Sequence, residues 1–351
     1  MRRGGIRFAG AVALSAAALW LAARNAHIED MRAAIGRARF IWLLPYPVIC
    51  IGLNVLRGEI WRRLLEQRVT TPQAFWAYSV GFLANNVLPF RVGEAARVVV
   101  LSARGGVPVV EVAAAAGLER LLDMAVLSLM LVMVAPAVAH VPGLVNSGFL
   151  VVLLVATALV VVGALARFRD RSSLAVEKAT AWLPTGMRQL AVERWADLTR
   201  GLSVLFKRSI GTPAAGASMV VWILTVVLQW LVLRAFQAQA GLADAAFMIA
   251  AVSLATALPA APGFVGVYHW VGQQSLVAAF PHVYDASTAL AAATVAHAAS
   301  YATSTALGVM GLCYFGMPAS AVTEAVRSGG AVEMRANDGR SETETLAGVT
   351  N

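Results

Sequence analysis

Long apolar runs separated by short polar segments make up most of this chain. Eight runs stand out: Ile6–Ala23, Phe40–Leu56, Phe75–Leu88, Leu121–Val138, Phe149–Leu165, Ala214–Leu233, Ala245–Leu258 and Ala289–Phe315. The longest provide the ~20 residues that an α-helix needs to cross the hydrocarbon core of a bilayer. The pattern predicts an all-α fold, a polytopic bundle of membrane helices.

A proline and a glycine interrupt the chain directly after the third run. Pro89 and Gly93 follow Phe75–Leu88, and the apolar character resumes up to Leu101. The stretch 72–101 spans about thirty residues, which is too short for two crossings of ~20 residues each and a turn. We therefore predict a re-entrant hairpin that enters from the cytoplasmic side, turns near Pro89 and returns. Irregular backbone at membrane depth is tolerated only where protein buries it or where it lines a cavity.

A second break follows Ala245–Leu258 and repeats this arrangement. Its residues are Pro259, Pro262, Gly263 and Gly266, and a short apolar run continues to Phe280. Proline removes an amide donor and glycine permits close helix approach, so these residues are expected to make the break itself. Counting crossings makes this hairpin enter from the opposite face. Two broken segments at matching places predict an inverted-repeat transporter.

The composition supports a membrane protein and changes the interpretation of the charge. Of the 351 residues, 59% are hydrophobic and 13% are charged, whereas soluble domains have about 25% charged residues. A net charge of +9 would suggest nucleic acid as the partner of a soluble chain. In a membrane protein it indicates Lys and Arg retained on the cytoplasmic side, against anionic lipid, so we expect no nucleic-acid partner. The two cysteines lie in apolar runs, and we expect no disulfide, metal or cofactor.

The distribution of basic residues predicts the orientation. The polar stretch Arg167–Thr212 holds nine Lys or Arg against four Asp or Glu, which places it in the cytoplasm. The segment Arg57–Thr71 and the N-terminus are expected on the same side, and Ala289–Phe315 returns the C-terminus there. Residues 1–317 would form the integral domain of a cell inner (plasma) membrane protein, and 318–351 a disordered cytoplasmic tail.

Two basic segments need a separate explanation. The segment Arg24–Arg39 contains four arginines although it falls on the outer side, and we predict a short amphipathic helix on the membrane surface there. Trp61, beside Arg62 and Arg63, is expected to be an aromatic and basic anchor at the membrane interface.

Charged residues cluster around the first break. They are Arg91, Glu94, Arg97, Glu119, Arg120 and Asp123. A charge in lipid costs about 2.5–3.5 kcal/mol on insertion scales, so such residues usually face a cavity or one another. Glu94 lies three residues from both Arg91 and Arg97 and shares a helix face with them. Glu119 and Asp123, four residues apart, would repel unless a cation lies between them.

This cluster has two interpretations. Three cations and three anions sum to zero, so it is either a self-neutralised structural network or a site for an anionic lipid headgroup. In the second case Arg91 or Arg97 would bind a lipid phosphate in bidentate fashion, and the first amides of the following helix would face the anion. Asn85 and Asn86 are expected to satisfy broken backbone groups at the hairpin tip, and Asn86 is also a candidate substrate-binding residue.

Three motifs in this order carry a resemblance to a known family. They are Asn86-x-x-Pro89-x-Arg91-x-Gly93-Glu94-x-x-Arg97, then Glu119-Arg120-x-x-Asp123, then Pro259-x-x-Pro262-Gly263-x-x-Gly266. From about residue 5 to 317 the chain resembles the transmembrane region of lysylphosphatidylglycerol synthase, a flippase-like family. The resemblance implies an integral membrane module implicated in moving lipids between leaflets. In two-part synthases a soluble aminoacyltransferase domain follows; we expect none here, because nothing after residue 317 is long or apolar enough to fold.

The chain departs from the family at three positions. Phe264 follows Gly263 where the family often has a second glycine, His269 stands where it usually has an acid, and His297 where it often has a base. The resemblance therefore implies that two histidines replace an acid–base pair. Each histidine is either a hydrogen-bonded core residue or a titrating group, since imidazole titrates near neutrality.

The leading functional prediction is a lipid translocator for an anionic or phosphate-headed lipid. A site at the bilayer midplane would be exposed alternately to the two sides. We expect no enzyme activity, because the chain has no nucleophile elbow, zinc-protease motif, phosphate loop or dinucleotide fingerprint. Two alternatives remain open: an accessory partner of a lipid- or isoprenoid-modifying enzyme, and a membrane transferase that uses Glu119 or Asp123 as a base.

Overall fold

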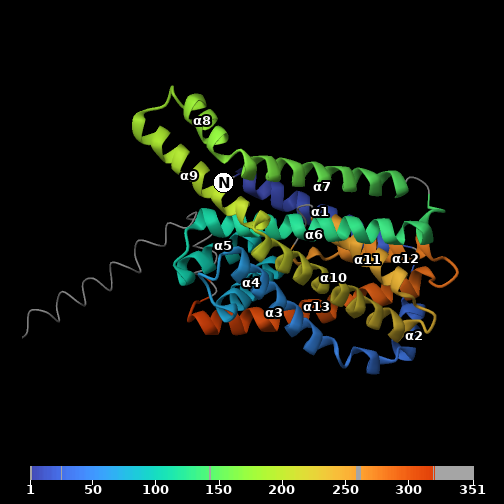
Figure 1. Cartoon of the computed structure of the whole chain (residues 1–351). Helices are drawn as coiled ribbons and strands as arrows, with labels where there is room; N and C mark the ends of the chain where they lie inside the picture. Colours follow the sequence, from blue (N-terminus) through green and yellow to red (C-terminus); the bar gives the residue numbers. More distant parts are fainter. Residues whose placement is uncertain (1, 25, 142–143, 258–261, 319, 321–351) are drawn as a thin grey trace, which may run out of the picture.

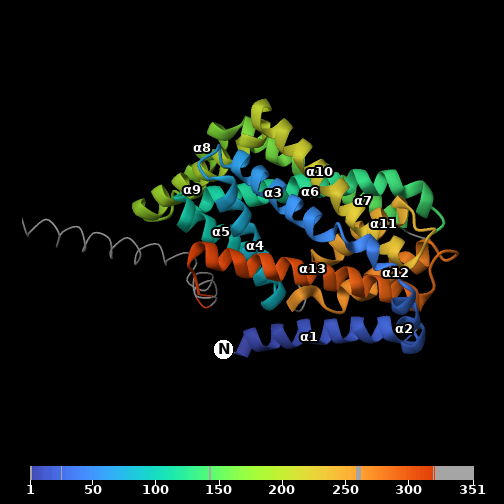
Figure 2. The same cartoon turned by 90° about the horizontal axis from the view of Figure 1, so that it is seen from below.

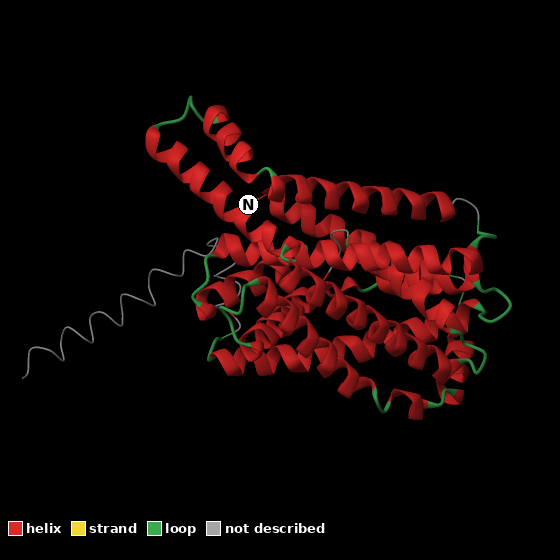
Figure 3. Ribbon diagram, in the orientation of Figure 1, coloured by secondary structure: helices red, strands yellow, loops and turns green. Residues whose placement is uncertain are grey.

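The computed structural model describes residues 2–24, 26–141, 144–257, 262–318 and 320, and every element in these ranges is helical (Figure 3). The helices are α1 (Arg2–Ala23), α2 (Ile28–Arg37), η1 (Phe40–Leu43), α3 (Tyr46–Leu64), α4 (Thr71–Val87), α5 (Val92–Gly105), α6 (Val109–Val138), α7 (Leu144–Arg167), α8 (Arg169–Ala179), α9 (Thr185–Ser203), η2 (Val204–Phe206), α10 (Arg208–Phe236), α11 (Leu242–Thr256), η3 (Pro262–Phe264), α12 (Val267–Ala279) and α13 (Ala286–Phe315). The predicted all-α class is confirmed. Pro259 and nearly all of the predicted tail 318–351 lie outside the described residues.

Four helices in the described ranges are both long and apolar enough to cross a membrane. They are the combined helix Phe40–Leu64, α6, the segment Gly148–Arg167 of α7, and α10. The thirty residues of α13 would also reach across a bilayer at ~1.5 Å per residue, but its many Ala, Ser, Thr and Gly residues make it less apolar. Its place in the membrane remains a prediction.

Helices α3 and α10 pack antiparallel and define the two ends of the bundle. An ion pair between Lys207 and Glu66 joins the start of α10 to the end of α3. At the other end, the amide of Arg39 donates to the carbonyl of Ala235 at 2.8 Å. These contacts provide a reference for the direction of each hairpin.

The first hairpin consists of α4 and α5, which pack closely side by side (Figure 1). A capping box between Thr70 and Gln73 starts α4, and the helix ends at the break predicted near Pro89. Gly93 allows the close approach, because a Cβ there would lie 1.9 Å from the carbonyl oxygen of Gly81. The base of this hairpin lies at the Glu66 end of α3.

The second hairpin consists of α11, η3 and α12. It follows α10, so its base lies at the opposite end of the bundle, near Ala235. Gly263 and Gly266 have φ of 64° and 88°, in the left-handed region that favours glycine. A Cβ on Gly266 would lie 2.1 Å from the carbonyl oxygen of Ser15 in α1, so this glycine also seats α1 against the hairpin.

The tips of the two hairpins meet inside the bundle. A guanidinium nitrogen of Arg91 lies 3.1 Å from the carbonyl oxygen of Ala257, at the end of α11. The helices therefore form two hairpins that start at opposite ends of the bundle and touch at their tips. Their re-entrant position in a membrane and the inverted repeat remain predictions.

Helix α13 runs past both hairpins and holds the first one tightly. A Cβ on Gly308 would lie 2.3 Å from the Cβ of Leu83, and one on Gly311 would lie 3.0 Å from the carbonyl oxygen of Trp76. Bare backbone at these two positions therefore lets α13 lie directly against α4.

Three parts of the chain lie at the periphery. Helix α1 runs along one flank and contacts α12 (Figure 2), and α7 lies along another (Figure 1). The predicted polar stretch Arg167–Thr212 contains the helices α8 and α9, which project from the bundle (Figure 1). The segment 24–39 contains the predicted helix, α2; its location on the outer surface remains a prediction.

Candidate functional site

A cavity of about 530 Å³ lies between the two hairpin tips. Residues of α3 to α6 line one side, and residues of α10 to α13 line the other. Its charged lining residues are Arg57, Arg91, Glu94 and Arg120. The remaining lining residues combine hydroxyl and amide groups with apolar side chains.

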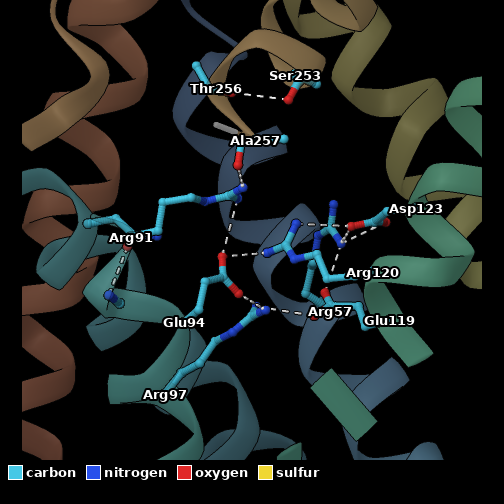
Figure 4. Close-up of polar contacts among 12 residues, drawn as sticks. Arg57, Arg91, Glu94, Arg97, Glu119, Arg120, Asp123, Ser253, Thr256 and Ala257 are labelled. Carbon is cyan, nitrogen blue, oxygen red and sulfur yellow. Dashed lines mark hydrogen bonds and ion pairs between the residues drawn. The ribbon is translucent and has the colours of Figure 1, made fainter. Parts of the chain in front are cut away.

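Arg57 lies at the centre of the charged cluster (Figure 4). Its Nη1 is 2.8 Å from Oε1 of Glu119 and 2.7 Å from Oδ2 of Asp123. It is therefore the cation that the spacing of these two acids requires. Arg57 was predicted to be one of the cytoplasmic arginines; it instead points into the bundle, because α3 continues seven residues beyond it, to Leu64. Asn54, Arg57 and Trp61 fall on one helix face, and this periodicity could have identified it.

Trp61 was predicted to be an interfacial anchor, and this prediction was wrong. Its side chain is fully buried in the core around α3 to α6. The indole Nε1–H donates to Oε2 of Glu119 at 2.8 Å. A second indole, that of Trp222 in α10, donates to Oδ1 of Asp123 at 2.9 Å. Both carboxylates are thus held by arginine and tryptophan donors.

Arg97 belongs to the buried part of the cluster. Only 3% of the residue is exposed; its Nη1 lies 3.1 Å from Glu119, and Nη2 pairs with Glu94. Its guanidinium also lies over the rings of Trp61 and Tyr78, at 4.9 and 4.8 Å. Arg97 does not line the cavity, so a structural role fits it better than the predicted role of phosphate ligand.

Glu94 joins the buried pairs to the cavity. It lies between Arg97 and Arg120, whose Nη2 is 2.9 Å from Oε1 of Glu94 (Figure 4). Arg120 also reaches Asp123 at 3.5 Å, and 36% of its side chain is exposed. The six predicted residues therefore form one network, with Arg57 as an additional member.

Arg91 is the least neutralised cation of this network. Its contact with Glu94 is long, at 3.5 Å, and its closer partner is the uncharged carbonyl of Ala257. Arg91 and Phe90 have φ of 56° and 62°, a left-handed conformation that costs non-glycine residues about 1–2 kcal/mol. This strained turn points the guanidinium at the cavity.

The amides at the start of α5 are less available than expected. The amide of Gly93 donates to Oδ1 of Asn85 at 2.8 Å, and the amide of Glu94 donates to the carbonyl of Arg91. Asn85 thus satisfies a backbone group at the break, as predicted. The anion site expected at the helix N-terminus is therefore largely occupied by the protein itself.

Asn86 does not satisfy the broken backbone. Its Nδ2 lies 2.9 Å from both Oγ of Ser304 and Oγ1 of Thr305 in α13, and its carbonyl accepts from the hydroxyl of Tyr301 at 3.3 Å. It lines the cavity and ties the first tip to α13. A role in substrate binding remains a prediction.

The network carries one uncompensated positive charge. Four guanidinium groups (Arg57, Arg91, Arg97 and Arg120) face three carboxylates (Glu94, Glu119 and Asp123). The sequence-based count of three cations and three anions was incomplete, because it left out Arg57. The least neutralised of these cations, Arg91, is half-buried and lines the cavity, so an anion in the cavity would balance the surplus charge.

The two histidines contact each other at the second tip. Their ring centroids are 4.9 Å apart. Nε2 of His297 lies 2.8 Å from the carbonyl oxygen of Gly263, and Nδ1 of His269 accepts the amide of Gly266 at 3.3 Å. Both rings thus hold the backbone of the break, which supports the core interpretation. A titrating role remains a prediction.

The described residues include no group of three His, Cys, Asp or Glu close enough to hold a metal ion. The carboxylates nearest to the cavity are already bound by arginines, which would compete with a metal for their oxygens.

Comparison with known proteins identifies the family. The profile of the lysylphosphatidylglycerol synthase TM region matches residues 8–308, which include the charged cluster and the described part of the second break. Searches of curated proteins and of solved structures gave no match. The chain belongs to the lysylphosphatidylglycerol synthase TM-region family.

Proposed function

We propose that this membrane protein is a lipid translocator that moves an anionic or phosphate-headed lipid between the leaflets. One observation carries the proposal: a cavity bounded by two opposed hairpin tips holds a charge network with one surplus positive charge. A lipid phosphate would neutralise that charge in a region of low dielectric constant, where neutralisation is worth most.

Arg91 is the proposed ligand of the phosphate. Its present partner is the uncharged carbonyl of Ala257, whereas a phosphate is an anion that accepts from a guanidinium in bidentate fashion. Phosphate would therefore compete well for the guanidinium. Because this contact joins the two tips, its loss would weaken the connection between the hairpins. The cavity would then open to one side at a time.

The lipid tails would stay in the bilayer while the headgroup crosses. The cavity of about 530 Å³ is of the size that holds small-molecule ligands, and two acyl chains would not fit in addition to a headgroup. Lining residues from α3 and α13 place the polar space next to helices with exposed apolar faces.

We place the protein in the cell inner (plasma) membrane with both termini in the cytoplasm. The basic helices α8 and α9 support this orientation through the positive-inside rule. They follow α7 at the end of the bundle from which the first hairpin starts.

The two alternatives have less support. A transferase would need Glu119 or Asp123 as a base, yet both are about 1% exposed and bonded to Arg57. An accessory role for a lipid-synthesis enzyme would leave the cavity and its surplus charge without a use.

Reconstitution into proteoliposomes tests the proposal. A fluorescent phosphatidylglycerol, labelled on an acyl chain with a nitrobenzoxadiazole group, should become accessible to external dithionite faster than in protein-free vesicles. Arg91→Gln should slow this process by about 10–100-fold, the equivalent of losing one charged hydrogen bond. Arg104→Gln, an exposed change on the same helix, is the matched control. If wild-type protein moves no lipid at all, the proposal is wrong.

A further inference from the structure

We infer that the cargo is a phosphodiester lipid with a single negative charge and an uncharged, hydroxyl-bearing headgroup, such as a glycerol, inositol or sugar phosphate. This inference rests on the proposed function and specifies its substrate class. It combines two features of the cavity: its charge balance and the polar groups beyond the arginines.

The charge balance favours a monoanion. Arginine stays protonated, and each carboxylate of the network accepts from at least one guanidinium within 3.1 Å, so all three count as ionised. The network is then left with a single positive charge. A phosphodiester carries one negative charge and neutralises it. A phosphomonoester carries about −1.5 to −2 at neutral pH and would leave excess negative charge in a buried site.

The same network disfavours a headgroup that contains an amine. Glu94 is the one carboxylate among the described lining residues, and Arg91, Arg97 and Arg120 already contact it. An ammonium group would enter a space lined by the guanidiniums of Arg57, Arg91 and Arg120. It would find no free carboxylate there as a partner. This arrangement disfavours zwitterionic ethanolamine and choline headgroups, and most strongly a cationic aminoacylated one.

Beyond the arginines, the cavity presents hydroxyl groups. Ser253 and Thr256 lie beside Ala257, next to the guanidinium of Arg91 (Figure 4). Ser300 and Thr303 of α13 also line the cavity. A hydroxyl oxygen has two lone pairs and accepts hydrogen bonds from the hydroxyls of a ligand.

These groups retain hydrogen-bonding capacity. Oγ1 of Thr303 donates to the carbonyl of Ala299 at 2.8 Å, and Oγ1 of Thr256 donates to that of Val252 at 2.8 Å. Each hydroxyl therefore donates its proton within its own helix. Its oxygen lone pairs remain able to accept a hydrogen bond from a donor in the cavity. A polyol supplies such donors, whereas a methylated amine supplies none.

Proteoliposomes with a series of acyl-labelled lipids test the inference. The probes are phosphatidylglycerol, phosphatidylinositol, phosphatidylmethanol, phosphatidic acid, phosphatidylethanolamine, phosphatidylcholine and lysylphosphatidylglycerol. The glycerol and inositol lipids should cross at least about tenfold faster than phosphatidic acid and the amine-bearing lipids, a ratio equivalent to ~1.4 kcal/mol. Phosphatidylmethanol, a monoanion without hydroxyls, should fall between these groups.

Thr303→Val separates hydroxyl recognition from charge. It should slow phosphatidylglycerol by about 2–10-fold, as expected for one neutral hydrogen bond, and leave phosphatidylmethanol unchanged. Thr294→Val is the matched control, because Thr294 makes the same bond to its own helix, to Leu290 at 2.7 Å, and does not line the cavity.

The outcomes distinguish this inference from the proposed function. If no lipid crosses, both are wrong. If lipids cross at rates independent of the headgroup, or the amine-bearing lipids cross fastest, translocation stands and the substrate class is overturned. Equal rates for phosphatidylglycerol and phosphatidylmethanol, together with an inert Thr303→Val, would overturn the hydroxyl specificity.

Discussion

The two hairpins share a shape and differ in chemistry. The first carries Arg91, Glu94 and Arg97 at and just beyond its break, whereas the described part of the second tip is neutral and is held by His269 and His297. Each packs into its own apolar core: one formed mainly by α3 to α6, the other by α10 to α13. The difference suggests a division of labour in which the first hairpin supplies charge and the second supplies carbonyl and hydroxyl groups.

Removing a buried carboxylate beside the first hairpin should have the largest effect. Glu119→Gln leaves Arg57 and Arg97 with too little negative charge, and breaking such a pair costs about 3–5 kcal/mol. We expect a marked fall in the thermal unfolding temperature in detergent, measured by tryptophan fluorescence. Asp244→Asn, at the base of the second hairpin, should cost about 1–3 kcal/mol, because its partners are the neutral Gly241 amide and Tyr284 hydroxyl.

Glu59→Gln is the control for this first prediction. Glu59 pairs with Arg62 and Arg63 near the surface, where ion pairs contribute about 0–1 kcal/mol. If Glu119→Gln were no more destabilising than Asp244→Asn, the contrast between a charged and a neutral hairpin would not hold.

Adding one methyl group inside each hairpin should give the next largest difference. In Gly93→Ala the new Cβ meets the rigid carbonyl of Gly81, whereas in Gly272→Ala it lies 2.7 Å from the flexible end of Met248. We expect a loss of about 3 kcal/mol for the first and under ~1 kcal/mol for the second, within the range for overpacking. Both are measured by the same unfolding experiment, and equal losses would contradict the prediction.

Introducing a glycine at the first tip and replacing one at the second should have different effects on stability and on transport. Arg91→Gly relieves a left-handed backbone strain of about 1–2 kcal/mol, so stability should be kept while lipid transport falls by about 10–100-fold. Gly263→Ala introduces the same strain at the second tip, and its Cβ would lie 2.8 Å from the Tyr301 ring. It should therefore cost at least about 1–2 kcal/mol. Transport and unfolding are measured on the same preparations; a stable Arg91→Gly protein with full transport would remove Arg91 from the site.

The smallest effect is expected at the histidines. His297→Gln should cost about 1 kcal/mol, the usual net value of one hydrogen bond, through the contact with Gly263. Because both rings hold backbone atoms, we expect transport by this variant and by wild type to have the same pH profile between about pH 6 and 8. A pH-dependence that disappears in the variant would instead support the titrating role.

The sequence located the breaks better than it located the site. Apolar runs and the residues Pro89, Pro262 and Gly263 act locally, so they predicted both hairpins and the first turn. Glu119 and Asp123, four residues apart, even indicated that a cation must lie between them. Which cation it is depends on how α3 packs against α6, and a single sequence does not reveal that contact.

Arg57 shows the physical reason for the error. At the end of an apolar run, the positive-inside rule does not distinguish a cytoplasmic arginine from one that is buried in the core. Only the length of the helix separates the two cases. Because α3 extends to Leu64, Arg57 and Trp61 are internal. This changed the net charge of the cluster from zero to one and gave the predicted anion site its surplus positive charge. The hydroxyls of α11 and α13 were missed because Ser and Thr in an apolar helix give no distinct pattern.

Helix α13 touches both tips: Asn86 bonds to Ser304 and Thr305, and His297 bonds to Gly263. Because Gly308 and Gly311 lie against α4, a shift of α13 along the bundle axis would displace both hairpin tips together. In the proposed translocator, one helix bound to both tips would keep the cavity from opening to the two sides at the same moment, so that no continuous pore forms.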